Sequence, residues 1–364
     1  MQKTSAWPLA LAYLGLIGYA SLYPFTEWRD QGIFPWAFLF AALPKYWTGF
    51  DVASNVLGYV PAGFLLALTA WRTGRGRRAI VLATLVCAAV SLIMEALQSY
   101  LPARVPSNVD FVLNAAGGWL GAVTATLLER VGAIAHWSRL RARWFVADAR
   151  GALVLLALWP AALLFPAAVP LGLGQVLERL ETALVDLLED TPFLDWVPVR
   201  DMELQPLLPG AEFVCVVLGA LIPCLIAYCI VRSRLRRLVC VGLTMLAGIT
   251  STGLSAALSY GPQHAWDWIH QPVLAALGVA PVLAMLLLWA PRRASAALAL
   301  LAMGIYLSLL NQAPADPYFM QTLQTWEQGR FIRFHGLAQW LGWMWPYGAL
   351  VYLLSQVWEQ DGKN

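Results

Sequence analysis

The sequence predicts an all-α protein, a polytopic bundle of membrane-spanning helices. Of its 364 residues, 60% are hydrophobic and 12% are charged, whereas a typical soluble domain has about 25% charged residues. Apolar runs recur along the whole chain, and a helix needs roughly 20 apolar residues to cross a bilayer. These observations together lead us to expect about ten transmembrane helices.

Each expected helix corresponds to one apolar run. The third run contains a single charged residue, Glu95. The first lacks the small-residue pattern of a signal-peptide cleavage site, so we expect that helix to be retained. The runs are 4–26, 52–71, 79–101, 111–128, 151–177, 213–231, 238–266, 268–291, 294–315 and 334–358.

Basic residues gather in alternate loops. Most of the 24 lysines and arginines lie after the second, fourth, sixth and eighth expected helices, in the segments 72–78, 130–150, 232–237 and 292–293. Cytoplasmic loops of membrane proteins carry such an excess of Lys and Arg. We therefore expect both termini and the arginine loops on the cytoplasmic side of the membrane.

One expected external segment, 171–210, is amphipathic. Val176, Leu180, Leu184 and Leu187 recur at helical spacing among acidic residues. Such a helix lies along a membrane surface. We interpret it as a plug that covers the bundle, with a substrate-gating lid as the alternative.

A degenerate internal repeat is visible. Four pairs of segments match: 56–68 with 217–229, 72–78 with 232–237, 91–100 with 251–260, and 114–118 with 274–278. Both copies begin on the same side of the membrane, so they would be parallel repeats. The expected domains are 1–130, a degenerate second copy over 131–293, and two additional helices in 294–364.

The second copy loses most of the polar residues of the first. Glu95 becomes Ser255, and both amides that follow become leucines. Asp110 aligns with His270, and Glu212 stands near the place of Asp51. We infer a working first half and a second half that serves mainly as a scaffold.

Three carboxylates in the first half lie in or beside apolar helices, each followed by an amide about one turn later. The candidate ligand-binding residues are Asp51, Asn55, Glu95, Gln98, Arg104, Ser107, Asp110 and Asn114. Residues three or four apart share a helix face, and the topology places all eight at the outer side of the membrane. Ionisable groups in spans are costly and indicate a functional site. Helix caps and polar contacts between helices are the alternative interpretation.

Metal and redox sites are not expected. The five cysteines fall in or beside predicted spans without ligand or redox spacing. We expect no metal, no cofactor and no nucleic-acid partner, and we regard the arginine loops as topology determinants first.

The same residues resemble the VanZ family of bacterial membrane proteins. The shared pattern covers about 7–130 and consists of Ser21-Leu22-x-Pro24, Asp51-x-x-x-Asn55, Pro61-x-Gly63, Glu95-x-x-Gln98, Arg104, Ser107, Asp110-x-x-x-Asn114 and Gly117/Gly118-x-x-Gly121. The name member of that family is associated with resistance to teicoplanin, a lipid-tailed glycopeptide. The resemblance implies a bacterial inner-membrane protein with a role in the cell envelope, near lipid-linked or amphiphilic molecules, and it suggests a link to antibiotic resistance. It supplies no reaction.

Three functions remain open at this stage. The leading hypothesis is binding or handling of an amphiphilic envelope molecule, or membrane lipids, in an outward-facing polar site. The second is acid–base hydrolysis or transfer on a lipid-linked substrate, with Glu95 and Asp110 as the candidate catalytic residues. The third is transport, suggested by the repeat and by acids in spans.

Overall fold

The part of the chain that the structure describes folds mainly into α-helices. The computed structural model describes residues 6–23, 25, 27–43, 49–165, 167–189, 191–194, 204–314 and 332–358. The predicted motif residue Pro24 and parts of the predicted external segment, 190 and 195–203, lie outside these ranges. The described helices fall into two compact units, Met1–Leu140 and Arg141–Asn364.

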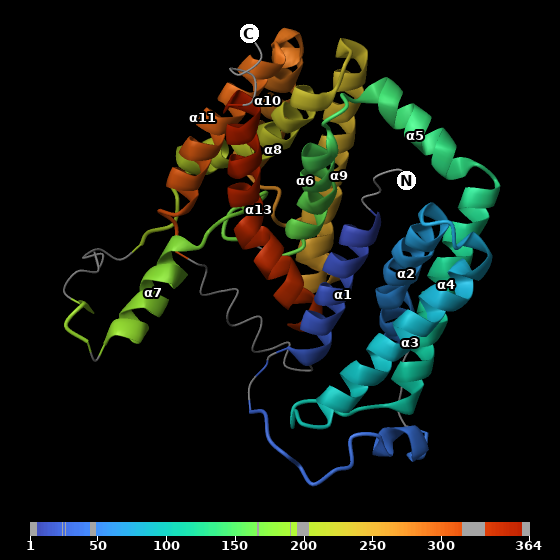
Figure 1. The fold of residues 1–364 in the computed structure, drawn as a ribbon. Helices are drawn as coiled ribbons and strands as arrows, with labels where there is room; N and C mark the ends of the chain where they lie inside the picture. The colour runs from blue at the N-terminus through green and yellow to red at the C-terminus, as the bar shows by residue number, and fades with distance from the viewer. Residues whose placement is uncertain are drawn as a thin grey trace. The chain divides into compact units, whose positions relative to one another are not determined.

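The N-terminal unit is built from four apolar helices (Figure 1). Its elements are α1 (Ala6–Leu22), the short 3-10 helix η1 (Ala37–Phe40), α2 (Gly49–Arg72), η2 (Gly76–Arg78), α3 (Ala79–Gln98) and α4 (Asn108–Arg130). Helices α2, α3 and α4 each contact the other two, and α1 packs on α2 and α3. The helix α5 (Ala133–Trp144) follows in sequence.

Glycines bring α2, α3 and α4 into backbone contact. A Cβ atom on Gly121 would lie 1.9 Å from the carbonyl oxygen of Val60, and one on Gly118 would lie 2.5 Å from the Cβ of Cys87. Small residues allow such close approach between membrane helices. Gly117, Gly118 and Gly121 of the sequence motif therefore serve the close packing of these helices.

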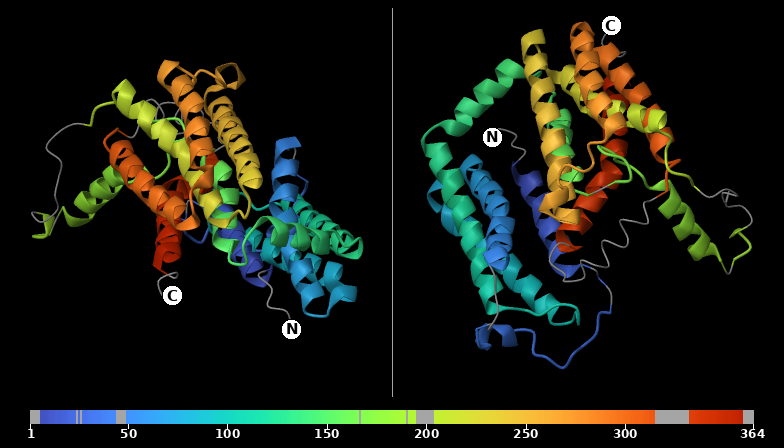
Figure 2. Two further views of the ribbon diagram at one scale, coloured as in Figure 1. Left: turned by 90° about the horizontal axis from the view of Figure 1, so that it is seen from above. Right: turned by 180° about the vertical axis from the view of Figure 1, so that it is seen from behind.

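The C-terminal unit surrounds one buried helix. Its elements are α6 (Arg150–Ala162), α7 (Leu177–Leu188), α8 (Pro209–Ile230), α9 (Arg234–Tyr260), η4 (Pro262–His264), α10 (Gln271–Leu286), η5 (Leu287–Trp289), α11 (Arg292–Leu310) and α13 (Ile332–Trp358). Nearly every residue of 215–230 in α8 is buried, because α6, α9, α10 and α11 all pack against it (Figures 1 and 2). A helix that is apolar on every side belongs in such a position.

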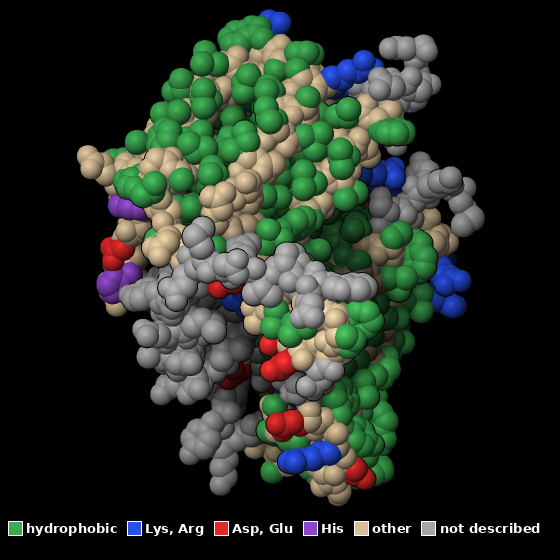
Figure 3. Space-filling view, turned by 90° about the vertical axis from the view of Figure 1, so that its left-hand side faces the viewer, with side chains coloured by type: hydrophobic (Ala, Val, Ile, Leu, Met, Phe, Trp, Pro, Cys, Tyr) green, Lys and Arg blue, Asp and Glu red, His purple; other side chains and the backbone are tan. Residues whose placement is uncertain are grey.

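The predicted polytopic helix bundle is confirmed. Seven helices of the described chain are long and apolar enough to cross a membrane, namely α2, α3, α4, α8, α9, α10 and α11, and two shorter apolar helices are α1 and α6. On the face shown in Figure 3, hydrophobic side chains form a broad continuous area, and charged side chains lie mainly at its margins. Such a surface is typical of contact with lipid. The count of about ten spans stays a prediction.

The fifth predicted span requires a correction. We expected a helix over 151–177, but α6 ends at Ala162, and the chain then follows an irregular path to the start of α7. Leu171 has a φ of 59° and Gly174 a φ of 90°. Pro170 lacks a backbone N–H and disfavours helix. Nevertheless Leu163, Leu171 and Leu173 are buried, so the apolar composition reflects burial inside the protein.

Side chains of other helices pair the backbone of this irregular segment. The hydroxyl of Tyr306 donates to the carbonyl of Leu171 at 2.9 Å and accepts a hydrogen bond from the N–H of Leu173. The side-chain oxygen of Asn311 accepts from the N–H groups of Val176 and Leu177, both at 3.1 Å. Unpaired backbone groups are costly in apolar surroundings, so these side chains stabilise the segment.

The amphipathic segment forms the helix α7, which projects away from the other helices of its unit (Figures 1 and 2). Its apolar face is exposed: Leu180 is 54% and Leu187 is 74% accessible. This exposure agrees with a helix at the membrane surface, although its predicted roles as a plug or a lid stay predictions.

The two units repeat one pattern of helix contacts. In the first, α1 packs on α2 and α3, and the trio α2, α3 and α4 packs together. In the second, α6 packs on α8 and α9, and the trio α8, α9 and α10 packs together. All five of these contacts among α1, α2, α3 and α4 thus have a counterpart among α6, α8, α9 and α10. The third predicted domain, 294–364, contributes α11 and α13 to that same second unit.

Replacing Gly121 by Ala should destabilise the N-terminal unit by about 3 kcal/mol, because the new methyl group meets backbone that cannot move aside. Gly58→Ala is the matched control on α2, since nothing lies within 4 Å of its added Cβ. We expect the control to be neutral or slightly stabilising. Thermal unfolding of the purified variants in one detergent tests this, and equal unfolding temperatures would contradict the close packing.

Replacing Tyr306 by Phe should destabilise the C-terminal unit by about 3 kcal/mol, because it leaves two buried backbone groups without partners. Tyr347→Phe is the control. The Tyr347 hydroxyl donates to the Gly174 carbonyl at 3.3 Å, but that carbonyl also accepts from the Asn311 amide. Denaturation in micelles should separate the two variants clearly, and a Tyr306→Phe protein as stable as the control would count against the pairing role.

Candidate functional site

The predicted polar residues gather at one end of the N-terminal unit. Helices α1 and α3 end there, and α2 and α4 begin there. A segment that includes Arg29, Gln31 and Ala41 lies across this end: the Arg29 N–H donates to the Tyr100 carbonyl, the Gln31 amide to the Ser99 carbonyl, and the Asn108 amide to the Ala41 carbonyl. The structure thus brings the predicted residues of four helix ends together.

Glu95 is the central carboxylate of this group. It is only 4% exposed, and its Oε2 accepts a hydrogen bond from the backbone N–H of Ser107 at 2.8 Å. Ser107 is the N-cap of α4, where its hydroxyl accepts from the N–H of Asp110 at 3.3 Å. Both contacts pair N–H groups at the start of a helix, a common role of polar residues there. Glu95 therefore also fixes the beginning of α4 against α3.

Gln98 and Arg104 hold the end of α1. The Gln98 amide donates to the Ser21 carbonyl at 2.9 Å. The buried guanidinium of Arg104 donates to the carbonyls of Tyr23 at 3.0 Å and Ala20 at 3.1 Å. The last carbonyls of a helix have no partner within the helix, so these two side chains cap α1. Their predicted contact with a ligand stays untested, and the geometry gives them a positioning role.

A second polar layer lies one turn deeper. The Asn114 side chain is 6% exposed and donates to the hydroxyl of fully buried Ser91 at 3.0 Å. The hydroxyl of Tyr59 lies beside Ser91 in this layer. The side-chain oxygens of Asn114 and Tyr59 are buried and have no hydrogen-bond partner among the described residues. Two unsatisfied oxygens in one layer are unusual, because nearly all buried polar atoms are paired.

Sequence reasoning missed Tyr59 and Ser91. Both follow the periodicity of the predicted residues, since Ser91 precedes Glu95 by one turn and Tyr59 follows Asn55 by one turn. Extending each polar face by four residues would have found them. Their residue types carry no signal alone, because both are ordinary in membrane helices.

The two aspartates lie at the same level of the bundle. Asp51 and Asp110 each fall in the first turn of their helix, and both are half-buried. The packing of Gly117 on the Val56 carbonyl fixes the register between α2 and α4. Counting back from that contact at about 1.5 Å per residue places the aspartates within roughly 3 Å of one level. Asn55 lies one turn below Asp51.

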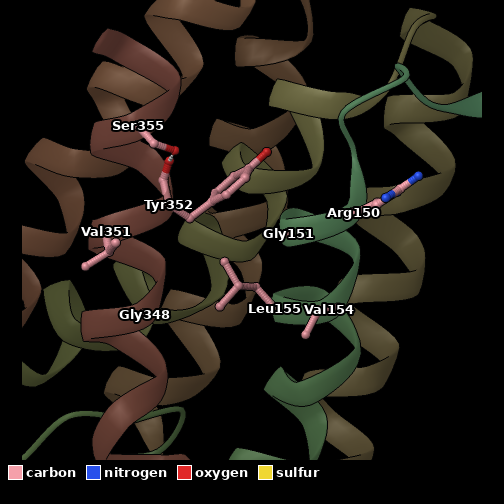
Figure 4. A pocket seen from close by; sticks show the side chains of 8 residues that line it. All are labelled: Arg150, Gly151, Val154, Leu155, Gly348, Val351, Tyr352 and Ser355. Atoms are coloured by element: carbon pink, nitrogen blue, oxygen red, sulfur yellow. Dashed lines mark hydrogen bonds between the residues drawn. The ribbon is translucent and has the colours of Figure 1, made fainter. Parts of the chain in front are cut away.

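The site differs from the groove in the C-terminal unit (Figure 4). That groove has a volume of about 460 Å³ between α6 and α13 and is lined by Arg150, Gly151, Val154, Leu155, Gly348, Val351, Tyr352 and Ser355. None of the predicted site residues lines it. Across the described ranges, no three His, Cys, Asp or Glu side chains are grouped as metal ligands.

Replacing Arg104 by Gln should lower the stability of the N-terminal unit by about 2 kcal/mol or more, because several carbonyls at the end of α1 lose a charged donor. Arg77→Gln, at an exposed position in η2, is the control. The unfolding temperatures of both variants are measured in the same detergent. Equal values for Arg104→Gln and Arg77→Gln would contradict the capping role.

Comparison with known proteins places the polar motifs in a family. Residues 5–129 match the model of the VanZ/LLP1 family, which covers helices α1 to α4 and every predicted site residue. No curated protein and no solved structure is detectably similar to the chain. The resemblance found in the motifs is thereby confirmed for one part of the chain: residues 5–129 of this multi-pass membrane protein form a VanZ-like region.

Proposed function

We propose that the N-terminal unit binds the polar head of an amphiphilic envelope molecule at the end of the bundle that holds Glu95. The observation that carries this proposal is the buried layer of Tyr59, Ser91 and Asn114, in which two oxygen atoms lack a hydrogen-bond partner. A ligand that supplies a donor to Asn114 and a partner for the Tyr59 hydroxyl would satisfy both.

Energetics support a ligand in this place. A buried polar atom without a partner costs about 1–3 kcal/mol. A helix bundle that only needed caps and polar contacts between helices would gain stability from an apolar side chain at either position. Gln98, Arg104 and Ser107 already cap the helices, and the Asn114 amide joins α4 to Ser91 of α3. The Asn114 side-chain oxygen and the Tyr59 hydroxyl remain for another purpose.

The surroundings favour an amphiphile over a water-soluble ligand. Broad apolar surfaces lie beside the polar site, with Leu57, Ile93 and Val112 exposed on α2, α3 and α4. A molecule with an acyl chain would keep its tail along these helices while its head enters the polar layer. The arginine distribution predicts that this end of the unit faces outward across the bacterial inner membrane, where lipid-linked envelope molecules lie.

Replacing Glu95 by Gln and Asp110 by Asn, separately and at matched protein levels, tests the proposal in cells. We expect each variant to alter susceptibility to lipoglycopeptides, the profile of envelope lipids, or both, because the carboxylates help to form the site. The control is Glu129→Gln, which removes a carboxylate of α4 that pairs with Arg72 at 3.7 Å, at the far end of that helix.

Unchanged susceptibility and lipid profiles in both variants would overturn the proposed function. Purified protein incubated with lipid-linked substrates separates binding from catalysis: a product that disappears in the Glu95→Gln protein would replace simple binding with acid–base chemistry.

A further inference from the structure

The groove between α6 and α13 has a polar end and an apolar end. Its volume of about 460 Å³ lies within the range of small-molecule sites. Arg150, Tyr352 and Ser355 line it where α6 begins and α13 approaches its end (Figure 4). The side chains of Val154 and Val351 line it further along both helices. The lining therefore changes from polar to apolar along the groove, which is the pattern that an amphiphilic ligand requires.

Two glycines shape this groove. A Cβ atom on Gly151 would lie 2.9 Å from the ring of Tyr352, so glycine lets that ring lie directly against α6. A Cβ atom on Gly348 would meet only Leu155, at 3.8 Å, which is an ordinary contact. The space beside Gly348 is therefore open. Val351, in the next turn of α13, is 70% exposed, so the groove is accessible from the surface of the unit.

Aromatic side chains mark the level of the membrane surface at the polar end. Trp144 lies shortly before α6, and its ring centroid is 5.6 Å from the guanidinium carbon of Arg236. Tyr352 lies near the end of α13. Trp and Tyr gather at the level of the lipid head groups. We therefore expect the polar end of the groove at this level and the apolar end among the acyl chains.

Positive charge gathers around the same end. Two segments meet just before α6, since the Arg232 N–H donates to the Trp144 carbonyl at 3.1 Å and the Val146 N–H to the Ile230 carbonyl at 3.0 Å. These segments, 141–150 and 231–237, carry seven arginines and one acidic residue. Arg150 is exposed at the mouth of the groove. The charge at this end is thus complementary to an anionic head group.

We infer that the groove between α6 and α13 binds one anionic phospholipid, with an acyl chain along Val154 and Val351 and the phosphate at Arg150. Arginine forms charge-assisted hydrogen bonds with phosphate oxygens. Basic pockets between membrane helices on the cytoplasmic side bind anionic lipid head groups, and the arginine distribution predicts that side for this end. The site belongs to the second unit, so it goes beyond the proposed function of the first.

A soluble anion fits the groove less well than a lipid. It would use only the polar end and would leave the exposed side chains of Val154 and Val351 without apolar contacts. A zwitterionic lipid would fill the apolar part equally well, but its own positive charge opposes the arginines. An acyl chain together with a net negative head group therefore matches both ends.

The full-length protein in a neutral detergent is titrated with dioleoyl phosphatidylglycerol and with dioleoyl phosphatidylcholine, and native mass spectrometry counts the bound lipids. The two lipids have the same acyl chains and differ in head-group charge. We expect the wild type to bind the anionic lipid about tenfold more tightly. Arg150→Gln should lose most of this preference. The matched control is Arg292→Gln, an exposed first residue of α11 as Arg150 is of α6, and it should keep the preference.

A second variant tests the apolar part of the groove. Gly348→Leu places a side chain in the open space without displacing backbone, because its Cβ atom meets only Leu155 at an ordinary distance. We expect it to weaken the binding of both lipids about tenfold while the protein stays folded. Gly304→Leu on α11 is its control, since nothing lies within 4 Å of the added Cβ atom, and it should bind as the wild type does.

Equal affinity of the wild type for the two lipids would overturn the inferred site. A preference for phosphatidylglycerol that survives both Arg150→Gln and Gly348→Leu would also overturn it, and would assign the preference to the other arginines. Inorganic phosphate alone is the remaining arm. If it raises the unfolding temperature of the wild type but not of Arg150→Gln, a soluble anion replaces the lipid.

Discussion

The need to pair every backbone polar group in apolar surroundings governs this structure. Where α1 ends, the amide of Gln98 and the guanidinium of Arg104 receive its last carbonyls. After α6, where the chain runs through the second unit without regular structure, Tyr306 and Asn311 likewise form hydrogen bonds with its backbone. In both units, the positions of these polar side chains are therefore determined first by the backbone groups that they pair.

This constraint divides the polar residues of the N-terminal unit into those that pair backbone groups and those that do not. Gln98, Arg104 and Ser107 are engaged with main-chain atoms and hold helices in place. Tyr59 and Asn114 keep buried oxygen atoms that no described residue pairs, so they depart from the rule. Buried oxygen atoms without a partner also occur at Thr252 and Ser259, but those of Tyr59 and Asn114 share one layer below Glu95 and lie within the part that matches the VanZ/LLP1 family.

Composition predicted the fold well and the backbone path less well. The apolar runs of α2, α3 and α4 and their motifs led to the right helices and to their meeting at one end. The apolar run that contains α6 led to the wrong expectation of one long helix. Apolar composition reflects burial and does not distinguish a helix from an irregular segment enclosed by protein. Pro170, Gly172 and Gly174 were the residues in the sequence that indicated a break in the helix. Tyr59 and Ser91 were not predicted as site residues, because their importance comes from neighbours on other helices, and a single sequence does not show which helices are neighbours.

The glycine contacts have a mechanical consequence. With Gly63 against the Gly118 carbonyl and Gly121 against the Val60 carbonyl, α2 and α4 have almost no freedom to slide or separate. Polar contacts from Tyr13, Gln98 and Arg104, by contrast, tie α1 to its neighbours through flexible side chains. We therefore expect any opening that admits a ligand between these helices to begin with a movement of α1, while α2, α3 and α4 stay together.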